Sequence, residues 1–135
     1  MMETKPTSAS QPQVSRVIPI YNSKGDAEAF LVYPSLFNRS GDYIGWVTPN
    51  RDVYSVLGYY VGYLTNEPRI LRARVQEVDK PRIKPVTPPR RISPPATVPL
   101  APMMQELMYS TLDVLLEEPE RLHALDAGEL REDLD

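Results

Sequence analysis

One stretch of twelve residues determines how this chain folds: Leu36-Phe37-Asn38-Arg39-Ser40-Gly41-Asp42-Tyr43-Ile44-Gly45-Trp46-Val47. It starts with an apolar and an aromatic residue and returns through a glycine, an aromatic and an apolar residue. The Asn-x-x-Gly segment in its centre is typical of a tight turn closed by a glycine in the left-handed backbone conformation, next to a β-bulge. The stretch therefore predicts a β-hairpin with two short antiparallel strands.

The same pattern occurs twice more without gaps. The other copies are Ile20-Tyr21-Asn22-Ser23-Lys24-Gly25-Asp26-Ala27-Glu28-Ala29-Phe30-Leu31 and Val53-Tyr54-Ser55-Val56-Leu57-Gly58-Tyr59-Tyr60-Val61-Gly62-Tyr63-Leu64. The predicted turn glycines, Gly25, Gly41 and Gly58, lie 16 and then 17 residues apart. Internal repetition at a fixed period is typical of folds built from one repeated supersecondary unit. We therefore expect three tandem hairpins.

The returning strand of each hairpin carries a small residue and then an aromatic one. The small residues are Ala29, Gly45 and Gly62, and the aromatic residues are Phe30, Trp46 and Tyr63. Small residues within strands favour close approach of a neighbouring backbone or a bulge. We expect the three aromatic side chains to fill equivalent sites in the central core. Tyr43, Tyr59 and Tyr60 fall outside these columns, and we expect them to form a surface patch.

A fourth unit follows at the same spacing. Arg69 to Val75 alternates partly like a strand but has no turn glycine. Because exposed strand edges promote aggregation, we expect this unit to be completed, with Val14 to Ile18 as the candidate partner. The prediction is an all-β head over residues 14–78, with tandem β-hairpins in a closed pseudo-fourfold arrangement.

The repeats resemble a known family, the small bacterial "4-fold beta flower" domain. The resemblance rests on Tyr21-Asn22 to Phe30, Phe37-Asn38 to Trp46 and Tyr54-Ser55 to Tyr63, and it covers about Val17 to Val78. It implies hairpins set around a central axis. It implies no enzymatic activity, so the resemblance supplies a fold and not a function.

The rest of the chain has a different composition. Residues 1–13 are polar and predict a disordered leader. Eight of the fifteen prolines fall between Pro81 and Pro102, which predicts a proline-rich linker over residues 79–102. Such a segment favours the extended polyproline conformation, about 3.1 Å per residue. We expect an extended tail that carries the C-terminal end tens of ångströms from the head.

Two short helices are predicted in this tail. Residues 103–118 show a helical pattern, and the candidate docking residues on its apolar side are Met104, Leu107, Met108, Leu112 and Leu115. An isolated helix of this length is marginal in water, so its apolar face needs a cover. Two covers remain open at this point: the head of the same chain, or another subunit or protein. A second short helix begins at Pro119 in the acidic tail, residues 119–135.

The charge is unevenly distributed along the chain. Residues 69–91 hold eight basic residues against Glu77 and Asp79, and residues 105–135 hold ten acidic residues against Arg121 and Arg131. The blocks either keep a disordered tail solvated, or attract each other, or each bind a charged partner of their own. A basic block attracts nucleic-acid phosphates, but the net charge of −3 and the position of the aromatic residues argue against nucleic-acid binding.

Catalytic residues are not predicted. The chain has no cysteine and a single histidine, His123 in the acidic tail, so we expect no catalytic site, cofactor or metal site. Without a signal peptide or transmembrane segment, we expect a cytoplasmic protein. The preferred hypothesis is a non-catalytic assembly or adaptor protein with a rigid head and a C-terminal segment that binds a protein partner or self-associates. The alternative is a small-ligand or carbohydrate-binding module that uses aromatic residues of the head.

Overall fold

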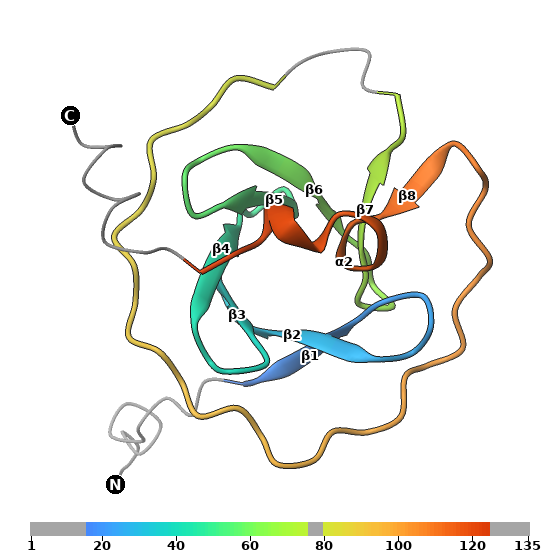
Figure 1. The fold of residues 1–135 in the computed structure, drawn as a ribbon, viewed down its shortest axis with the longest axis horizontal. Helices are drawn as coiled ribbons and strands as arrows, with labels where there is room; N and C mark the ends of the chain where they lie inside the picture. The colour runs from blue at the N-terminus through green and yellow to red at the C-terminus, as the bar shows by residue number, and fades with distance from the viewer. Residues whose placement is uncertain (1–15, 76–79, 125–135) are drawn as a thin grey trace, which may run out of the picture.

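Residues 16–75 and 80–124 are described by a computed structural model of the chain, and they form a curled half-barrel of eight antiparallel strands (Figure 1). The strands are β1 (Ile18–Tyr21), β2 (Ala27–Val32), β3 (Ser35–Asn38), β4 (Tyr43–Val47), β5 (Asp52–Ser55), β6 (Tyr60–Leu64), β7 (Ile70–Ala73) and β8 (Thr111–Asp113). Each strand is hydrogen-bonded to its neighbours in chain order. The helical turns α2 (Val114–Glu117) and η1 (Pro119–Arg121) follow β8. The prediction of an all-β head is confirmed.

The three predicted hairpins are present. They are β1–β2, β3–β4 and β5–β6, and each has a register shift at the same place in its repeat: between Ile20 and Tyr21, between Leu36 and Phe37, and between Val53 and Tyr54. A register shift one residue before the turn sharpens the local twist and brings the turn glycine into place. The local pattern of the sequence therefore determines these hairpins.

The fourth unit is completed by a different segment from the predicted one. Ile18 belongs to β1 and pairs with Leu31, whereas β7 pairs with β8, in which Leu112 lies opposite Arg72. The assignment of Val14 to Ile18 as the partner is wrong for Ile18, and Val14 lies outside the described residues. β7 pairs with a strand about forty residues later in the chain. The hairpin repeat does not extend to that strand, so the repeat did not predict this pairing.

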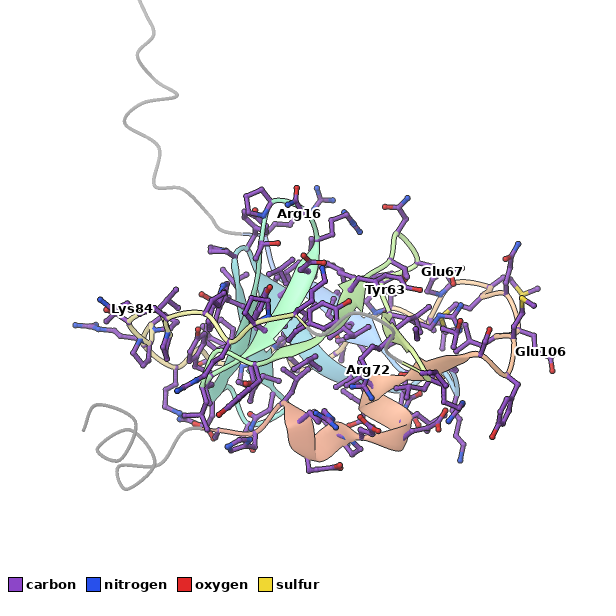
Figure 2. All side chains as sticks on the ribbon, turned by 90° about the horizontal axis from the view of Figure 1, so that it is seen from above. Arg16, Tyr63, Glu67, Arg72, Lys84 and Glu106 are labelled. Atoms are coloured by element: carbon purple, nitrogen blue, oxygen red, sulfur yellow. The ribbon has the colours of Figure 1, made fainter. Side chains whose placement is uncertain are left out.

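The core lies on the inner face of the sheet. The first apolar residues of the four units, Ile20, Leu36, Val53 and Ile70, are all 0% exposed. Leu112, Val114, Leu115 and Leu122 from the C-terminal segment belong to the same buried cluster. Figure 2 shows α2 along one side of the strands, where it covers this cluster. The C-terminal segment is therefore part of the folded head.

The proline-rich segment does not lead away from the head. Residues 80–110, which we call the strap, run around the outside of the half-barrel from β7 to β8 (Figure 1). The helix predicted over residues 103–118 is confined to Val114–Glu117, because residues 111–113 form β8 instead. Strand pairing with β7 outweighs the weak helical preference of so short a segment. Most of the 119–135 tail and the 1–13 leader lie outside the described residues.

Among the described residues, neither helical turn has the length or the apolar character that crossing a membrane requires.

Candidate functional site

The hairpin turns form the first part of the candidate site. The backbone N–H of each turn glycine donates to the carbonyl three residues earlier, at 2.9 Å in every hairpin. The glycine φ angles are 91°, 88° and 92° for Gly25, Gly41 and Gly58, the left-handed conformation that the turn pattern predicts. This conformation is strained for residues with a Cβ atom. The turns therefore present three nearly identical backbone surfaces.

Polar side chains rigidify these turns from within. The Asn22 side-chain oxygen accepts hydrogen bonds from the backbone N–H groups of Lys24 and Asp26, at 2.9 and 3.1 Å. Asn38 holds the second turn in the same way, and the Ser55 hydroxyl accepts one bond from the third. Asn and Ser side chains favour such turns because they bond to the local backbone. The turn backbones are thus preorganised for contacts with another segment.

The strap contacts the turns at intervals of nine residues. The backbone N–H of Ile83 donates to the Gly58 carbonyl at 3.0 Å, and that of Ile92 donates to the Gly41 carbonyl at 2.9 Å. Nine residues further on, the Ala101 Cβ lies 3.7 Å from the place that a Cβ would take on Gly25. The strap therefore passes the three turns in reverse chain order, one turn every nine residues.

An arginine precedes each docked isoleucine. Arg82 Nε donates to the carbonyl of Leu57 at 2.6 Å, and Arg91 donates to the carbonyl of Ser40. Leu57 and Ser40 are the residues before the two turn glycines, so the two arginines contact equivalent positions. Arg91 also pairs with Asp42 at 3.0 Å, whereas the Arg82 guanidinium lies over the Tyr59 ring, 5.1 Å from its centroid. The residue after the turn glycine thus completes each arginine site.

The strap carries a sequence repeat of its own that matches this docking and that is separate from the hairpin repeat. The strap repeats the pattern Arg-Ile-x-Pro at a spacing of nine residues, in Arg82-Ile83-Lys84-Pro85 and Arg91-Ile92-Ser93-Pro94. A spacing of nine does not match the 16–17 residues of the hairpins. Only the geometry shows that nine residues of extended strap span the distance between neighbouring turns.

Substituting alanine for each turn glycine should distinguish the turns that the strap contacts closely from the turn that it does not. A Cβ on Gly58 or Gly41 would lie 2.0 Å from the carbonyl oxygen of Ile83 or Ile92, whereas one on Gly25 would have only an ordinary contact. All three positions share the left-handed strain of about 1–3 kcal/mol. We expect Gly58→Ala and Gly41→Ala to lower the free energy of unfolding by about 1 kcal/mol more than Gly25→Ala, because each also displaces a strap hydrogen bond. Denaturant melts measure this difference, and equal losses at all three glycines would contradict strap docking.

The basic block is largely used within the chain. Six of its eight members, Arg69, Arg72, Arg74, Lys80, Arg82 and Arg91, hydrogen-bond to other parts of the described chain. Arg74, for example, forms a two-point ion pair with Glu117, at 2.9 and 3.1 Å. This pair lowers the pKa of the Glu117 carboxyl. The charge segregation of the sequence therefore serves contacts between the basic strap region, the turns and the acidic C-terminal segment.

The aromatic residues form a second cluster beneath the strap. Its buried members are Phe37, Tyr43, Trp46, Tyr54 and Val56, and Ile83 and Ile92 of the strap pack against it. The Trp46 ring is stacked on the Tyr54 ring, with 5.7 Å between centroids. Trp46 is thus buried, but in this cluster and not in the central core. Alternate residues of a strand point to opposite faces, so Trp46 and the core residue Val47 lie on different sides of the sheet.

Two aromatic predictions are wrong. Tyr63 is 39% exposed, although its equivalents Phe30 and Trp46 are 5% and 7% exposed. The strap lies beside Phe30, since Pro94, Pro95, Ala96 and Val98 line a cavity with it. Tyr43, expected in a surface patch, is only 7% exposed. Of that expected patch, Tyr59 is exposed, and the Lys80 ammonium lies 4.7 Å from the centroid of the half-buried Tyr60 ring.

Tyr43 should make the fold sensitive to alkali. Its burial raises the pKa of the phenol from 10.0 to about 12. In the unfolded chain the phenol ionises at its ordinary pKa, so the stabilisation due to this group is complete below about pH 10 and is lost as the pH rises to about 12. We expect Tyr43→Phe to flatten this part of the pH dependence of the melting temperature. An unchanged slope would contradict the burial of this hydroxyl.

A polar seam joins the first hairpin to the fourth unit. The Asp113 carboxylate is 1% exposed and accepts hydrogen bonds from the backbone N–H and the hydroxyl of Ser23, at 2.6 and 2.5 Å. Arg69, 2% exposed, donates to the Ser23 hydroxyl at 2.9 Å. The backbone N–H of Tyr21 also donates to the Pro68 carbonyl at 2.9 Å. A cavity of about 480 Å³ lies beside this seam, lined by Arg69, Asp113 and residues 104–109.

The five candidate docking residues lie in three different environments in the structure. Leu112 and Leu115 are 2% and 8% exposed and belong to the core of their own chain. Met104 and Leu107 are half-buried and line the cavity at the seam, and Met108 is 76% exposed. For Leu112 and Leu115 the apolar face is therefore covered by the head itself, because β8 pairs with β7 and carries them into the core.

Metal-binding side chains are not gathered among residues 16–75 and 80–124. No cluster of three or more histidine, cysteine, aspartate or glutamate side chains that could hold a metal ion occurs in this part of the chain. His123 is half-buried beside the C-terminal turn η1.

Comparison with known proteins adds no relative: no protein-family model, no curated protein and no solved structure matches this chain.

Proposed function

We propose that the protein is a non-catalytic interaction and assembly protein. Its β head is a rigid platform whose hairpin turns recognise extended segments of the type Arg-Ile-x-Pro. The strap is the docking peptide of the same chain, tethered to the platform at both ends by β7 and β8. The observation that carries this proposal is the nine-residue register, in which Arg82-Ile83 and Arg91-Ile92 contact equivalent atoms of two turns.

We further propose that the four units form a closed pseudo-fourfold ring, as in the "4-fold beta flower" domain that the repeats resemble. Contacts of Ser23 with Asp113 and of Tyr21 with Pro68 support it, because they join the first hairpin to the fourth unit. A ring places the hairpin turns at its rim. That placement suits a platform that binds a peptide running around it.

The test measures whether the platform binds the strap sequence from outside. A full-length variant with Arg82→Ala, Ile83→Ser, Arg91→Ala and Ile92→Ser removes the docked side chains from the strap and leaves the turns unchanged. A fluorescent peptide with the sequence of residues 80–102 serves as the probe. We expect the variant to bind it at least about tenfold more tightly than the wild type, because a tethered strap competes at an effective concentration of about millimolar.

A matched control distinguishes specific recognition of the peptide by the turns from non-specific binding of the peptide to the protein. Adding Gly58→Ala to the same variant should weaken the peptide binding, whereas adding Gly25→Ala should not, since the strap backbone lies against Gly58 and not against Gly25. Circular dichroism checks that the sheet is retained in each variant. If the folded variant binds no peptide, the platform function is wrong.

The carbohydrate-binding alternative has less support. Sugar stacking needs open aromatic faces, but Trp46 and Tyr54 are stacked on each other beneath the strap. The exposed Tyr59 ring is covered by the Arg82 guanidinium, at 5.1 Å. The variant with the four substitutions at residues 82, 83, 91 and 92 is called the strap-released variant. Binding of a sugar by this variant and not by the wild type would favour the carbohydrate-binding alternative.

A further inference from the structure

The first hairpin turn has the same groups as the two docked turns but a different strap segment. Lys24, Gly25 and Asp26 stand where the second turn has Ser40, Gly41 and Asp42. The strap offers Leu100-Ala101 here instead of Arg-Ile, and the Leu100 side chain is 95% exposed. Within the described part of the chain, no backbone N–H donates to the Gly25 carbonyl.

The arginine site at this turn is therefore open. In the second turn, the carboxylate of Asp42 and the carbonyl of Ser40 bind the same guanidinium, that of Arg91. At the first turn, Asp26 is exposed, and no arginine among the described residues forms an ion pair with it. The strap has an apolar residue at the position where it would need an arginine. The strap backbone still runs past this turn, because Ala101 lies against Gly25 and the Tyr21 hydroxyl donates to the Pro99 carbonyl at 2.7 Å. The turn therefore leaves only its arginine site open.

One further segment of the sequence carries an arginine in the same four-residue pattern as the docked strap segments. Arg16-Val17-Ile18-Pro19 repeats the order arginine, aliphatic residue, any residue, proline of the two strap segments. Arg16 is exposed and points away from the body of the molecule (Figure 2), and Val17 is 38% exposed. Pro19 is held in β1 opposite Phe30, so only the Arg16-Val17 pair is available for docking.

Arg16 cannot reach the open turn of its own molecule. It precedes β1, whereas Gly25 lies in the turn that follows β1, and Figure 1 shows the start of the strand and the turn at opposite ends of the hairpin. At about 3.3 Å per residue, the strand separates Arg16 from the start of the turn by about 20 Å. A second copy of the chain must therefore supply the arginine.

We propose that the first turn of one copy binds the Arg16 side chain of a second copy. The Arg16 guanidinium pairs with Asp26 and the carbonyl of Lys24, as Arg91 does with Asp42 and Ser40. The donor and the acceptor lie on different surfaces, so the contact is head to tail and leaves one of each free in a dimer. This inference rests on the proposed function, because it extends turn recognition from the strap to a neighbouring molecule.

The test is sedimentation of the full-length protein from micromolar to millimolar concentration, at low and high salt. We expect the wild type to associate increasingly with concentration and less at high salt, because the ion pair is exposed to solvent. Arg16→Ala and Asp26→Asn should each weaken the association at least tenfold. Arg39→Ala is the matched control, since Arg39 is an exposed arginine that lies 4.0 Å from Glu28 and forms no part of the proposed contact, and it should have no effect.

Mixing the two defective variants gives the decisive result. Arg16→Ala keeps an intact turn and Asp26→Asn keeps an intact donor, so an equimolar mixture should form a one-to-one dimer that cannot grow further. Leu100→Arg with Ala101→Ile should fill the turn from the same chain and block association. A monomeric wild type at all concentrations, or association unaffected by both single variants, would overturn the proposal. Capture of the 80–102 peptide is measured separately, so failure here with capture intact refutes only the intermolecular site.

Discussion

Replacing Leu112 with aspartate is expected to unfold the entire head. Leu112 lies in β8, is 2% exposed and belongs to the central core cluster. Removing such a side chain to alanine costs about 2–5 kcal/mol, and placing an unpaired carboxylate in an apolar core adds several kcal/mol. This sum approaches the whole stability of a small domain, about 5–15 kcal/mol. Circular dichroism of the full-length variant should show loss of the sheet at room temperature.

Met108→Asp is the control for this prediction. Met108 lies four residues earlier on the apolar stripe that the helical pattern predicted, but its side chain is 76% exposed. We expect its melting temperature to stay close to that of the wild type. A docking helix that is independent of the head would give the opposite result for Leu112: a head that melts normally and an altered assembly. That outcome would contradict the assignment of β8 to the sheet.

Replacing Trp46 with alanine is expected to lower the free energy of unfolding by about 3–5 kcal/mol, the range for a large buried aromatic residue. Trp46 is 7% exposed and stacks on Tyr54 in the cluster beneath the strap. Its native fluorescence should be blue-shifted and shielded from aqueous quenchers. Urea melts of the wild type and the variant measure the difference in stability.

Tyr63→Ala provides the comparison within the repeat. Tyr63 occupies the position equivalent to Trp46 in the third hairpin, but 39% of its surface is exposed. We expect it to cost clearly less than Trp46→Ala. In the strap-released variant, Trp46 emission should shift to the red, because Ile83 and Ile92 pack against its cluster. Freely quenched emission in the wild type would place Trp46 at the surface and revive the aromatic ligand-binding alternative.

The assignment of the turns shows how far local sequence reaches. Gly41 and Asn38 lie three residues apart, and their conformations follow from backbone sterics and from two hydrogen bonds that the Asn38 side chain accepts within the turn. The small residues of the returning strands differ, because a Cβ on Gly45 or Gly62 would lie 2.4 Å from a carbonyl oxygen of a strand outside its own hairpin. The sequence alone therefore predicts the three hairpins and the reason for each turn glycine, whereas the structure identifies the strand that lies against Gly45 and Gly62.

The burial of Trp46 and the exposure of Tyr63 could not be read from the repeats. Both occupy the same column, but Trp46 belongs to a cluster against which Ile83 and Ile92 of the strap pack, and these residues lie far away in sequence. The helical pattern of residues 103–118 was likewise misleading, since Leu112 and Leu115 are spaced for one helical face but belong to β8 and to α2. A short apolar run fits a strand or a helix equally well, and only the partner β7 decides between them.

The sequence by itself thus determined the hairpins, their turns and the all-β class, because these depend on residues that lie close together within one repeat. The tertiary structure alone decided that the proline-rich segment is a strap and that residues 111–113 pair with β7. Arg82 meets Leu57 and Arg91 meets Ser40 across 25 and 51 residues. Contacts over such separations depend on where the folded sheet places its turns, and the pattern of residues along the sequence does not contain that information.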